Sequence, residues 1–351
     1  AQLRLFNMIV GYLKTPGNNW RELMLHVVTN IDREVARTFV NNFFVNSVTV
    51  GGNIQRRVND AEGCNCPWAI LMDPTTRCNL HCNGCWAANY TSANHQDLTF
   101  EELDSIITQG VEMGTYVYLF TGGEPMTRKN DLIRLCEKHP DCYFSAFTNG
   151  TLVDEKFADD MLRVKNFMPA FSIEGFEEAT DSRRGKGTFQ KVTHAMDILR
   201  ERKLPFGASM CYTSQNFDSI VSDEYVKFLV DKGVLFAWIF TYMPVGLGAP
   251  TELLATADQR AKMYDIVRKN WRNNVPIFFA DFWNDGEYTG GCIAGARRYM
   301  HINAAGDVEP CAFIHYSDSN IREKSLQAFH HSLRRRERSG HAFEQGRKRR
   351  S

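Results

Sequence analysis

The pattern of apolar and polar positions divides the chain into two parts. Through residues 20–44, apolar side chains recur every three or four positions, the spacing that gathers them on one face of a helix. The pattern predicts an N-terminal helical segment over residues 1–63. Such a stripe usually packs on a core, and a role at a membrane surface or as a substrate lid is the alternative.

After Pro67 the pattern changes to short apolar runs separated by amphipathic helical stretches. Two of these stretches end at Gly114 and Gly233, where a left-handed helix cap costs little. Apolar strands that alternate with helices are typical of a parallel sheet covered by helices. We therefore predict an α/β fold, a partial (β/α)6 TIM-like barrel, over residues 64–285. The predicted strands are residues 68–73, 116–121, 143–148, 168–173, 206–212 and 236–243.

Polar or conformationally permissive residues collect after the first four predicted strands. In β/α barrels the chemistry lies at the C-terminal ends of the strands, so this rim is the predicted site. The candidates are a cysteine cluster after the first strand, Gly122, Gly123, Glu124 and Pro125 after the second, Asn149 and Gly150 after the third, and Ser172 to Gly175 at the fourth.

Charge and cysteine content narrow the possible functions. Lys plus Arg equals Asp plus Glu, 41 against 41, so no nucleic-acid partner is expected. No apolar run approaches the roughly 18 residues of a membrane-spanning helix, and no transmembrane segment is predicted. The ten cysteines are unevenly spaced, unlike a secreted disulfide framework, which favours a reducing, cytoplasmic location.

The last residues differ from the rest of the chain. Residues 333–351 hold eight basic and two acidic residues, a net charge of +6, without apolar periodicity. This composition predicts a basic, disordered tail.

The stretch TRCNLHCNGCW places Cys78, Cys82 and Cys85 within eight residues, as C-x3-C-x2-C. Three thiols cannot all be paired as disulfides, and they are one short of the four ligands that close a structural zinc site. His81 could complete a zinc site. The other interpretation is a [4Fe–4S] cluster held at three corners, which leaves one iron open to another ligand.

The cysteine spacing after the first barrel strand, the GGEP stretch after the second and the six β/α units together resemble the radical S-adenosylmethionine (radical SAM) enzymes. The resemblance implies that Cys78, Cys82 and Cys85 hold the cluster and that S-adenosylmethionine binds the fourth iron. An electron from a low-potential donor such as ferredoxin or flavodoxin then cleaves the sulfonium. The resulting 5′-deoxyadenosyl radical abstracts hydrogen from a substrate, either a peptide or protein side chain or a lipid or small metabolite.

The resemblance also implies a set of cofactor-contacting residues. The methionine part is expected at Gly122, Gly123 and Glu124, with Pro125 shaping the turn, and the ribose or methionine part at Thr148, Asn149, Ser172 and Glu174. Many family members have an aromatic residue before the third cysteine, but here that residue is Gly84. Trp86 is expected to take over the contact with adenine.

Cys292, Gly306 and Cys311 form a C-x13-G-x4-C pattern around a predicted small β-hairpin. It resembles the start of the SPASM or twitch extension, which implies an auxiliary iron–sulfur cluster. No cysteine follows Cys311, so the extension over residues 286–332 is expected to be incomplete or completed by other ligands. The alternative for the whole chain is a non-enzymatic iron–sulfur or zinc-binding electron-transfer module, which would give no reason for the GGEP stretch.

Overall fold

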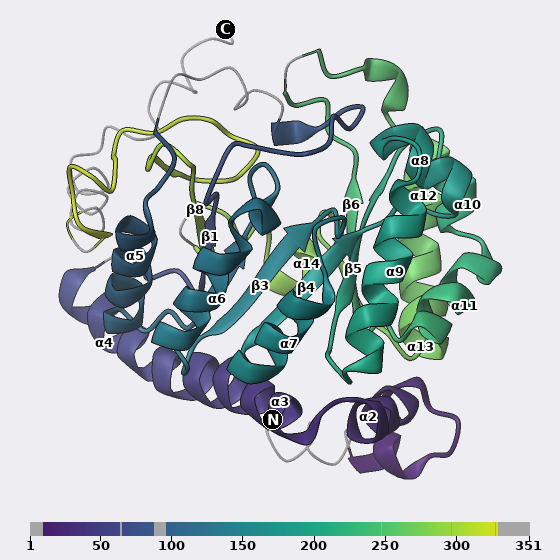
Figure 1. Ribbon diagram of the computed structural model, residues 1–351, viewed down its shortest axis with the longest axis horizontal. Coiled ribbons are helices and arrows are strands. Elements are labelled where there is room, and N and C mark those ends of the chain that lie inside the picture. Colours follow the sequence, from purple (N-terminus) through teal and green to yellow (C-terminus); the bar gives the residue numbers. More distant parts are fainter. Residues whose placement is uncertain are drawn as a thin grey trace, which may run out of the picture.

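The computed structural model describes residues 10–63, 65–87, 96–246, 248–295 and 297–326, together with residue 328 (Figure 1). The predicted tail lies outside the described residues. The strands are β1 (Ala69–Met72), β2 (Val117–Phe120), β3 (Tyr143–Thr148), β4 (Phe167–Ser172), β5 (Gly207–Tyr212), β6 (Phe236–Thr241), β7 (Phe278–Asp281), β8 (Tyr299–Ile302) and β9 (Val308–Glu309).

The helices alternate with the strands over most of the chain. They are α2 (Asn19–Asn30), α3 (Arg33–Phe39), η1 (Val40–Gly51), α4 (Gly52–Glu62), α5 (Phe100–Glu112), η3 (Pro125–Arg128), α6 (Lys129–Lys138), α7 (Glu155–Val164), α8 (Glu177–Arg184), α9 (Thr188–Glu201), α10 (Phe217–Ile220), α11 (Asp223–Lys232), η4 (Thr251–Leu253), α12 (Ala257–Asp265), η5 (Ile266–Trp271), α13 (Arg272–Asn274) and α14 (Gly286–Thr289).

The nine strands of the described residues form one sheet in the order β7-β6-β5-β4-β3-β2-β1-β8-β9, and every pair is parallel except β8 and β9. The sheet is open, with β7 and β9 at its two edges. The predicted α/β fold with a partial barrel is confirmed. Besides the six predicted core strands, β7 follows β6 at one edge of the sheet, and β8, the first strand of the predicted hairpin, joins β1 at the other.

Helix ends follow the capping residues of the sequence. Thr99 and Glu102 form a reciprocal capping box at the start of α5. Gly233 closes α11 with a positive φ of 91°, as predicted. Asp154 and Ser222 cap α7 and α11 in a similar way, because each side chain accepts a hydrogen bond from a backbone N–H in the first turn of its helix.

The two faces of the sheet differ. On β1, Ile70 and Met72 pack into the main core beneath the helices, and Figure 1 shows α5, α6, α7 and α9 in front of the sheet. Ala69 and Leu71 point to the other face, where a smaller apolar cluster includes Tyr143, Tyr299 and several half-buried aromatic rings. This alternation is the two-residue period of a strand.

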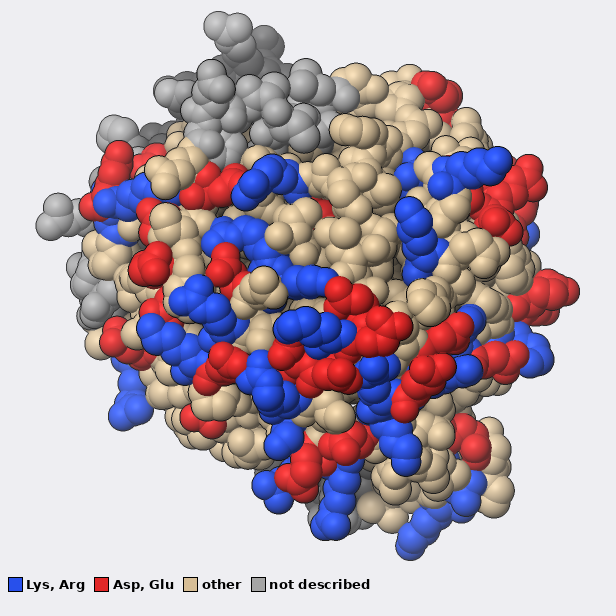
Figure 2. Space-filling model, viewed as in Figure 1, with Lys and Arg blue, Asp and Glu red and all other residues tan. Residues whose placement is uncertain are grey.

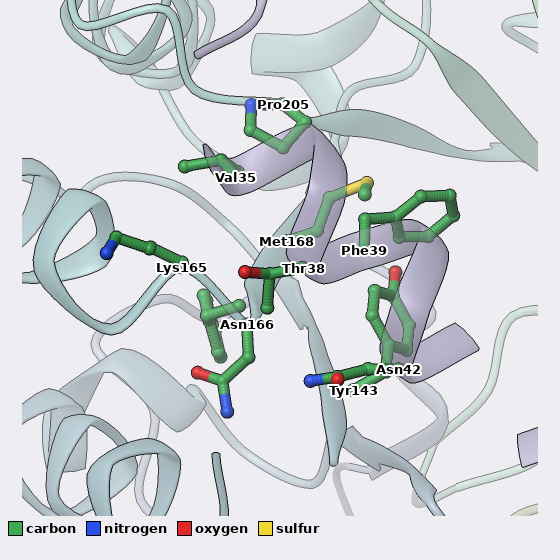
Figure 3. Close-up of a pocket in the computed structure, with 10 residues that line it drawn as sticks. Val35, Thr38, Phe39, Asn42, Tyr143, Lys165, Asn166, Met168 and Pro205 are labelled. Atoms are coloured by element: carbon green, nitrogen blue, oxygen red, sulfur yellow. The ribbon is translucent and has the colours of Figure 1, made fainter. Parts of the chain in front are cut away.

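The N-terminal helices α3, η1 and α4 follow one another without a break and lie at the N-terminal ends of the strands. Asn42 donates hydrogen bonds to the carbonyls of Pro140 (2.8 Å) and Cys142 (2.9 Å), just before β3. A small cavity of about 10 Å³ lies between this helix and the start of β3 and β4 (Figure 3). That volume suits about one water molecule and no cofactor.

Charges of both signs are intermixed on the face seen in Figure 2, in keeping with the balanced composition. Within the described part of the chain, none of the helices combines the length and apolarity needed to cross a bilayer.

Candidate active site

The loop after β1 packs directly against the turn after β2. We call residues 73–87 the cysteine loop. The N–H of Gly123 donates to the carbonyl of Thr75 (3.0 Å), and the N–H of Glu124 donates to that of Arg77 (2.8 Å). A Cβ on Gly123 would lie 2.3 Å from the carbonyl oxygen of Arg77, and Gly122 has a positive φ of 95°. Both glycines therefore let the two backbones meet.

The three predicted ligand cysteines lie together in this loop, each partly buried and none in a disulfide. Burial raises the pKa of Cys78 to about 11, and the nearby Cys82 and Cys85 add to the rise. Burial also raises the pKa of Cys82, against the opposing charge of Arg184. The pKa of Cys78 thus responds to both other thiols, and a positively charged centre beside the sulfurs would favour the thiolate forms of Cys78 and Cys82.

Glu124 is buried and fully engaged with the protein. Its carboxylate accepts hydrogen bonds from the Thr148 hydroxyl (2.7 Å), the Asn149 N–H (2.7 Å) and the Met126 N–H (2.9 Å). Burial raises its pKa, and these hydrogen bonds only partly oppose that rise. Glu124 therefore caps η3, which begins with Pro125, and ties the end of β2 to the end of β3.

Asn149 extends this network to the cysteine loop. Its side-chain amide donates to the Asn79 side chain (2.9 Å), and Asn79 in turn donates to the Thr151 hydroxyl (2.8 Å). The loop is thus hydrogen-bonded to the segment after β3 as well as to the turn after β2.

Glu174 lies after β4 and is fully buried between two arginines. Arg183 donates to its carboxylate (2.5 Å), and Arg184 binds both of its oxygens. Burial alone would raise the pKa of Glu174, but the two positive charges outweigh it, and the pKa is lowered. The ion-paired carboxylate is therefore ionised at neutral pH.

Both arginines also contact the cysteine loop. Arg183 donates to the carbonyl of Asn83 (3.3 Å) and accepts from its N–H through the backbone (2.8 Å). An Nη of Arg184 lies 3.9 Å from the sulfur of Cys82, a weak hydrogen bond. Glu174 thus acts on the loop through the arginines.

The two remaining predicted contacts lie elsewhere on the rim. Ser172 ends β4, is buried, and stands opposite Ser209 in the sheet. Trp86 stacks at a tilt on Phe313, with ring centroids 5.5 Å apart. The space beside Gly84 is occupied by Tyr242, since a Cβ there would lie 2.6 Å from that ring.

A buried cluster of titratable side chains, which the sequence analysis did not predict, lies at the junction of β1, β8 and β9. Nδ1 of His301 is 2.8 Å from Glu309, and Nε2 is 3.0 Å from Asp73, the latter an ion pair without an aligned hydrogen bond. Burial alone would lower the pKa of His301, but the charges of Asp73 and Glu309 outweigh it and raise the pKa to about 9.

The predicted auxiliary-cluster cysteines have different surroundings. Cys292 is exposed, whereas Cys311 is buried with its sulfur 3.0 Å from the hydroxyl of Tyr299. The predicted hairpin forms as β8 and β9, with Gly306 in the turn at a φ of 87°. Its first strand is part of the main sheet.

A cleft of about 580 Å³ opens beside the cysteine loop. Charged pairs of both signs line it, Arg77 with Asp97 (3.8 Å) and Arg128 with Asp131 (2.7 Å). The lining residues are Thr76, Arg77, Gln96, Asp97, Leu98, Arg128 and Asp131. None of the predicted cofactor-contacting residues lines this cleft, so the cleft lies apart from the expected cofactor site.

Residues 72–223 match the family model of the Radical SAM superfamily, a range that runs from the end of β1 to the start of α11. The chain belongs to the radical SAM superfamily. An AdoMet-dependent heme synthase from Methanosarcina barkeri is 24% identical over 290 residues, 75% of this chain and 82% of that protein. The PqqA peptide cyclase of Bradyrhizobium diazoefficiens is 23% identical over 268 residues, covering 74% and 70% of the two chains.

Solved structures show the same fold. Streptococcus suis SuiB bound to S-adenosylmethionine superposes with a TM-score of 0.62 at 18% sequence identity, over 89% of this chain and 82% of that chain. Because the family model matches and the curated relatives are enzymes, the protein is a radical SAM enzyme, and the family implies S-adenosylmethionine and a [4Fe–4S] cluster as its cofactors.

The cysteine loop fits such a cluster. In a cubane each thiolate binds its own iron, whereas the ligands of a single zinc ion converge on one point. Among the described residues, no three or more His, Cys, Asp or Glu side chains are arranged to hold a metal ion. The three free thiols of one loop, with a cationic Arg184 beside Cys82, are the type of donor that a three-cornered cluster needs.

Proposed function

We propose that Cys78, Cys82 and Cys85 bind the [4Fe–4S] cluster and that the surrounding rim binds S-adenosylmethionine. When bound, this pair supplies one-electron cleavage of the sulfonium and hydrogen abstraction from the substrate. The observation that supports the proposal is the direct contact of the cysteine loop with the Gly122–Gly123 turn, which brings the donor set and the expected cofactor site together.

The rim residues have separate roles in this proposal. The turn of Gly122, Gly123 and Pro125 lies against the cysteine loop, where the methionine part of the cofactor is expected, and Ser172 offers a hydroxyl at the end of β4. Glu124 positions Thr148 and Asn149 through its three hydrogen bonds. The remaining cofactor contacts that we propose are Glu174, through Arg183 and Arg184, and Trp86.

We propose a peptide or protein side chain as the substrate, entering on the face of the sheet opposite the helices. Relatives named as a PqqA peptide cyclase and a mycofactocin maturase, and the structure of SuiB bound to the precursor peptide SuiA, support this class. The heme synthase relatives favour a tetrapyrrole as a second candidate. A low-potential ferredoxin or flavodoxin would supply the electron.

The proposed division of the chain is an N-terminal helical segment (1–63), a radical SAM core (64–285), a SPASM- or twitch-like extension (286–332) and the basic tail (333–351).

The face opposite the helices is lined by half-buried aromatic side chains from the core and the extension, which suits a large apolar group. They are Phe147, Trp238, Phe240, Phe282 and Phe313.

The test is anaerobic reconstitution with iron and sulfide, followed by electron paramagnetic resonance with and without S-adenosylmethionine. We expect the spectrum of the reduced cluster to change when the cofactor is added, and 5′-deoxyadenosine to form with dithionite. An unchanged spectrum without 5′-deoxyadenosine would instead support a non-enzymatic electron-transfer module.

Cys82→Ala should abolish formation of 5′-deoxyadenosine, because two thiolates cannot hold the three-cornered cluster. Cys292→Ala is the matched control and should leave cleavage detectable, since Cys292 is exposed in the extension. Product formation is followed by liquid chromatography. Equal loss in both variants would contradict the assignment of the cysteines.

A further inference from the structure

Asp73, His301 and Glu309 form a buried row of titratable side chains that has no role in the proposed function. We call these three residues, together with His315, the carboxylate–histidine row. Oε2 of Glu309 is 2.8 Å from Nδ1 of His301, and Oδ2 of Asp73 is 3.0 Å from Nε2 of the same ring. The two carboxylates thus lie at the two nitrogens of one imidazole, and each nitrogen can carry a proton.

The outer end of the row reaches the protein surface. Nδ1 of His315 lies 3.4 Å from Oε1 of Glu309, and the side chain of His315 is 25% exposed. Asp73 and His301, in contrast, are buried. A proton on Glu309 is therefore one side chain away from solvent, whereas a proton on Asp73 must pass the imidazole first.

The inner end of the row lies beside the expected cofactor site. The N–H of Asp73 donates to the carbonyl of Ile302 (2.9 Å), so Asp73 continues the pairing of β1 with β8. A Cβ on Gly122 would lie only 2.8 Å from the Cβ of Asp73, and the ring centroids of His301 and Trp86 are 6.4 Å apart. The inner end therefore adjoins both the turn after β2 and the cysteine loop.

Asp73 differs from Glu124 and Glu174, the buried carboxylates that bind protein donors nearby. Glu124 accepts three hydrogen bonds, and Glu174 is bound by two arginines. Within the described part of the chain, neither oxygen of Asp73 accepts an aligned hydrogen bond. Buried polar atoms in this state are rare in folded proteins, and a catalytic role is one of the recognised reasons for them.

The charged groups that act on His301 come from two sides of the ring. Asp73 follows β1 and Glu309 is in β9, and their charges raise the pKa of His301 to about 9 although burial alone would lower it. His315 lies beyond Glu309, and the cysteine loop presents the uncharged ring of Trp86. The protonated ring can therefore release a proton toward a carboxylate on either side.

We propose that the carboxylate–histidine row is a proton pathway between the cofactor site and the protein surface at His315. Asp73 accepts a proton from an O–H, N–H or S–H group of a substrate bound beside the turn after β2. His301 then releases its Nδ1 proton to Glu309, and this proton leaves through His315 to water. One proton enters and one leaves, so the net charge of the row does not change, and no electron is transferred. The inference rests on the proposed function for the position of the cofactor site.

The experiment measures the exchange of the His301 ring protons with water by nuclear magnetic resonance of the full chain labelled with ¹⁵N-histidine. His301→Gln identifies the His301 signals by their loss. We expect the Nδ1 proton to exchange faster than the backbone N–H of His301, which has no such pathway. Glu309→Gln should slow the exchange at Nδ1 by on the order of a hundredfold, the lower end of what a positioned proton-transfer group contributes. His315→Gln should slow it by a smaller factor.

Asp104→Asn is the matched control, because Asp104 lies 2.7 Å from Nε2 of His139 in a second imidazole–carboxylate pair. It should leave the exchange at His301 unchanged. A variant that merely loosens the fold would speed up exchange at the ring and the backbone N–H together, which is opposite to the expected slowing. The proposal is overturned if the ring protons exchange no faster than that N–H, or if Glu309→Gln and His315→Gln leave their exchange rate unchanged.

The inner end of the row is tested on the reconstituted chain. Adding S-adenosylmethionine should shift the ring signals of His301, because Asp73 adjoins the cofactor site. Unshifted signals from a chain that still forms 5′-deoxyadenosine would overturn the pathway and leave the proposed function standing. If 5′-deoxyadenosine does not form either, the proposed function fails, and the pathway to that site fails with it.

Discussion

Gly122 and Gly123 are needed more for the close approach of the cysteine loop to the turn after β2 than for the shape of that turn. The space that a Cβ would need on Gly123 is taken by the carbonyls of Thr76 and Arg77. A side chain at this position would push the cysteine loop away from the turn. The GGEP stretch therefore positions the three thiols whether or not it also touches the cofactor.

Gly123→Ala should lower the free energy of unfolding by roughly 1–3 kcal/mol, because the neighbouring atoms belong to the backbone and have little room to move. Urea denaturation of the protein without its cluster measures the change. Gly52→Ala is the control, since Gly52 is helical and has nothing within 4 Å of its added Cβ. It should stabilise by roughly 0.5–1 kcal/mol. A neutral Gly123→Ala would show that the loop does not need the close contact.

His301 couples protonation to stability. Its pKa is about 9 in the folded chain, above the ordinary value of 6.5, so the protonated form is favoured by folding. The stabilisation is complete below pH 6.5 and is lost as the pH rises through 9. We expect the free energy of unfolding to fall by roughly 3 kcal/mol over this window, at about 1.4 kcal/mol for each unit of pKa shift.

His301→Gln should remove this part of the pH dependence, because the amide does not titrate. The comparison is made by urea denaturation of both proteins at a series of pH values between 6 and 10. If the two curves stay parallel, the imidazole is not held protonated by Asp73 and Glu309.

Single residues were predictable where a short motif contains them. Cys78, Cys82 and Cys85 were predicted as cluster ligands from their spacing; the structure shows their thiols free in one loop, and their role as ligands stays a prediction. The contact of His301 with Asp73 joins residues more than two hundred positions apart, and only the pairing of β1 with β8 brings them together. No local pattern carries that information.

At the scale of elements, periodicity located β1 to β6 to within a few residues of their bounds. It missed β7, a strand of four residues whose first side chain is exposed, which is too short for a clear pattern. The hairpin of β8 and β9 was predicted from its turn, but its parallel pairing with β1 was not. Turn residues specify which strands are adjacent in sequence and say little about the far side of a sheet.

The residues that bind the side chains of Glu124 and Glu174 could likewise not be predicted from local sequence patterns. Both were predicted as cofactor contacts, and the structure shows each bound by neighbouring protein groups. Arg183 and Arg184 reach Glu174 from the last turn of α8, which places both arginines beside the cysteine loop. Helix α8, which follows β4, thus helps to hold the cysteine loop in place through these two arginines.

At the scale of the molecule, β8 makes the C-terminal extension part of the core sheet. Ile302 pairs with Met72 in the register of β8 and β1, and both side chains are completely buried in the main core. The sheet would otherwise end at β1, directly beside the cysteine loop, with an open edge. The proposed extension therefore supports the site structurally even without a cluster of its own.

Ile302→Ala should lower the free energy of unfolding by about 2–5 kcal/mol, the range for truncating a buried side chain. Because β8 pairs with β1, the loss should appear in one cooperative transition of the whole chain. Urea denaturation followed both by far-ultraviolet circular dichroism and by tryptophan fluorescence tests this, and the two curves should coincide. Ile314→Ala, at a residue 53% exposed, should change stability by no more than about 0.5 kcal/mol. Two separate transitions, with only the smaller one shifted by Ile302→Ala, would mean that residues 286–332 fold apart from the core.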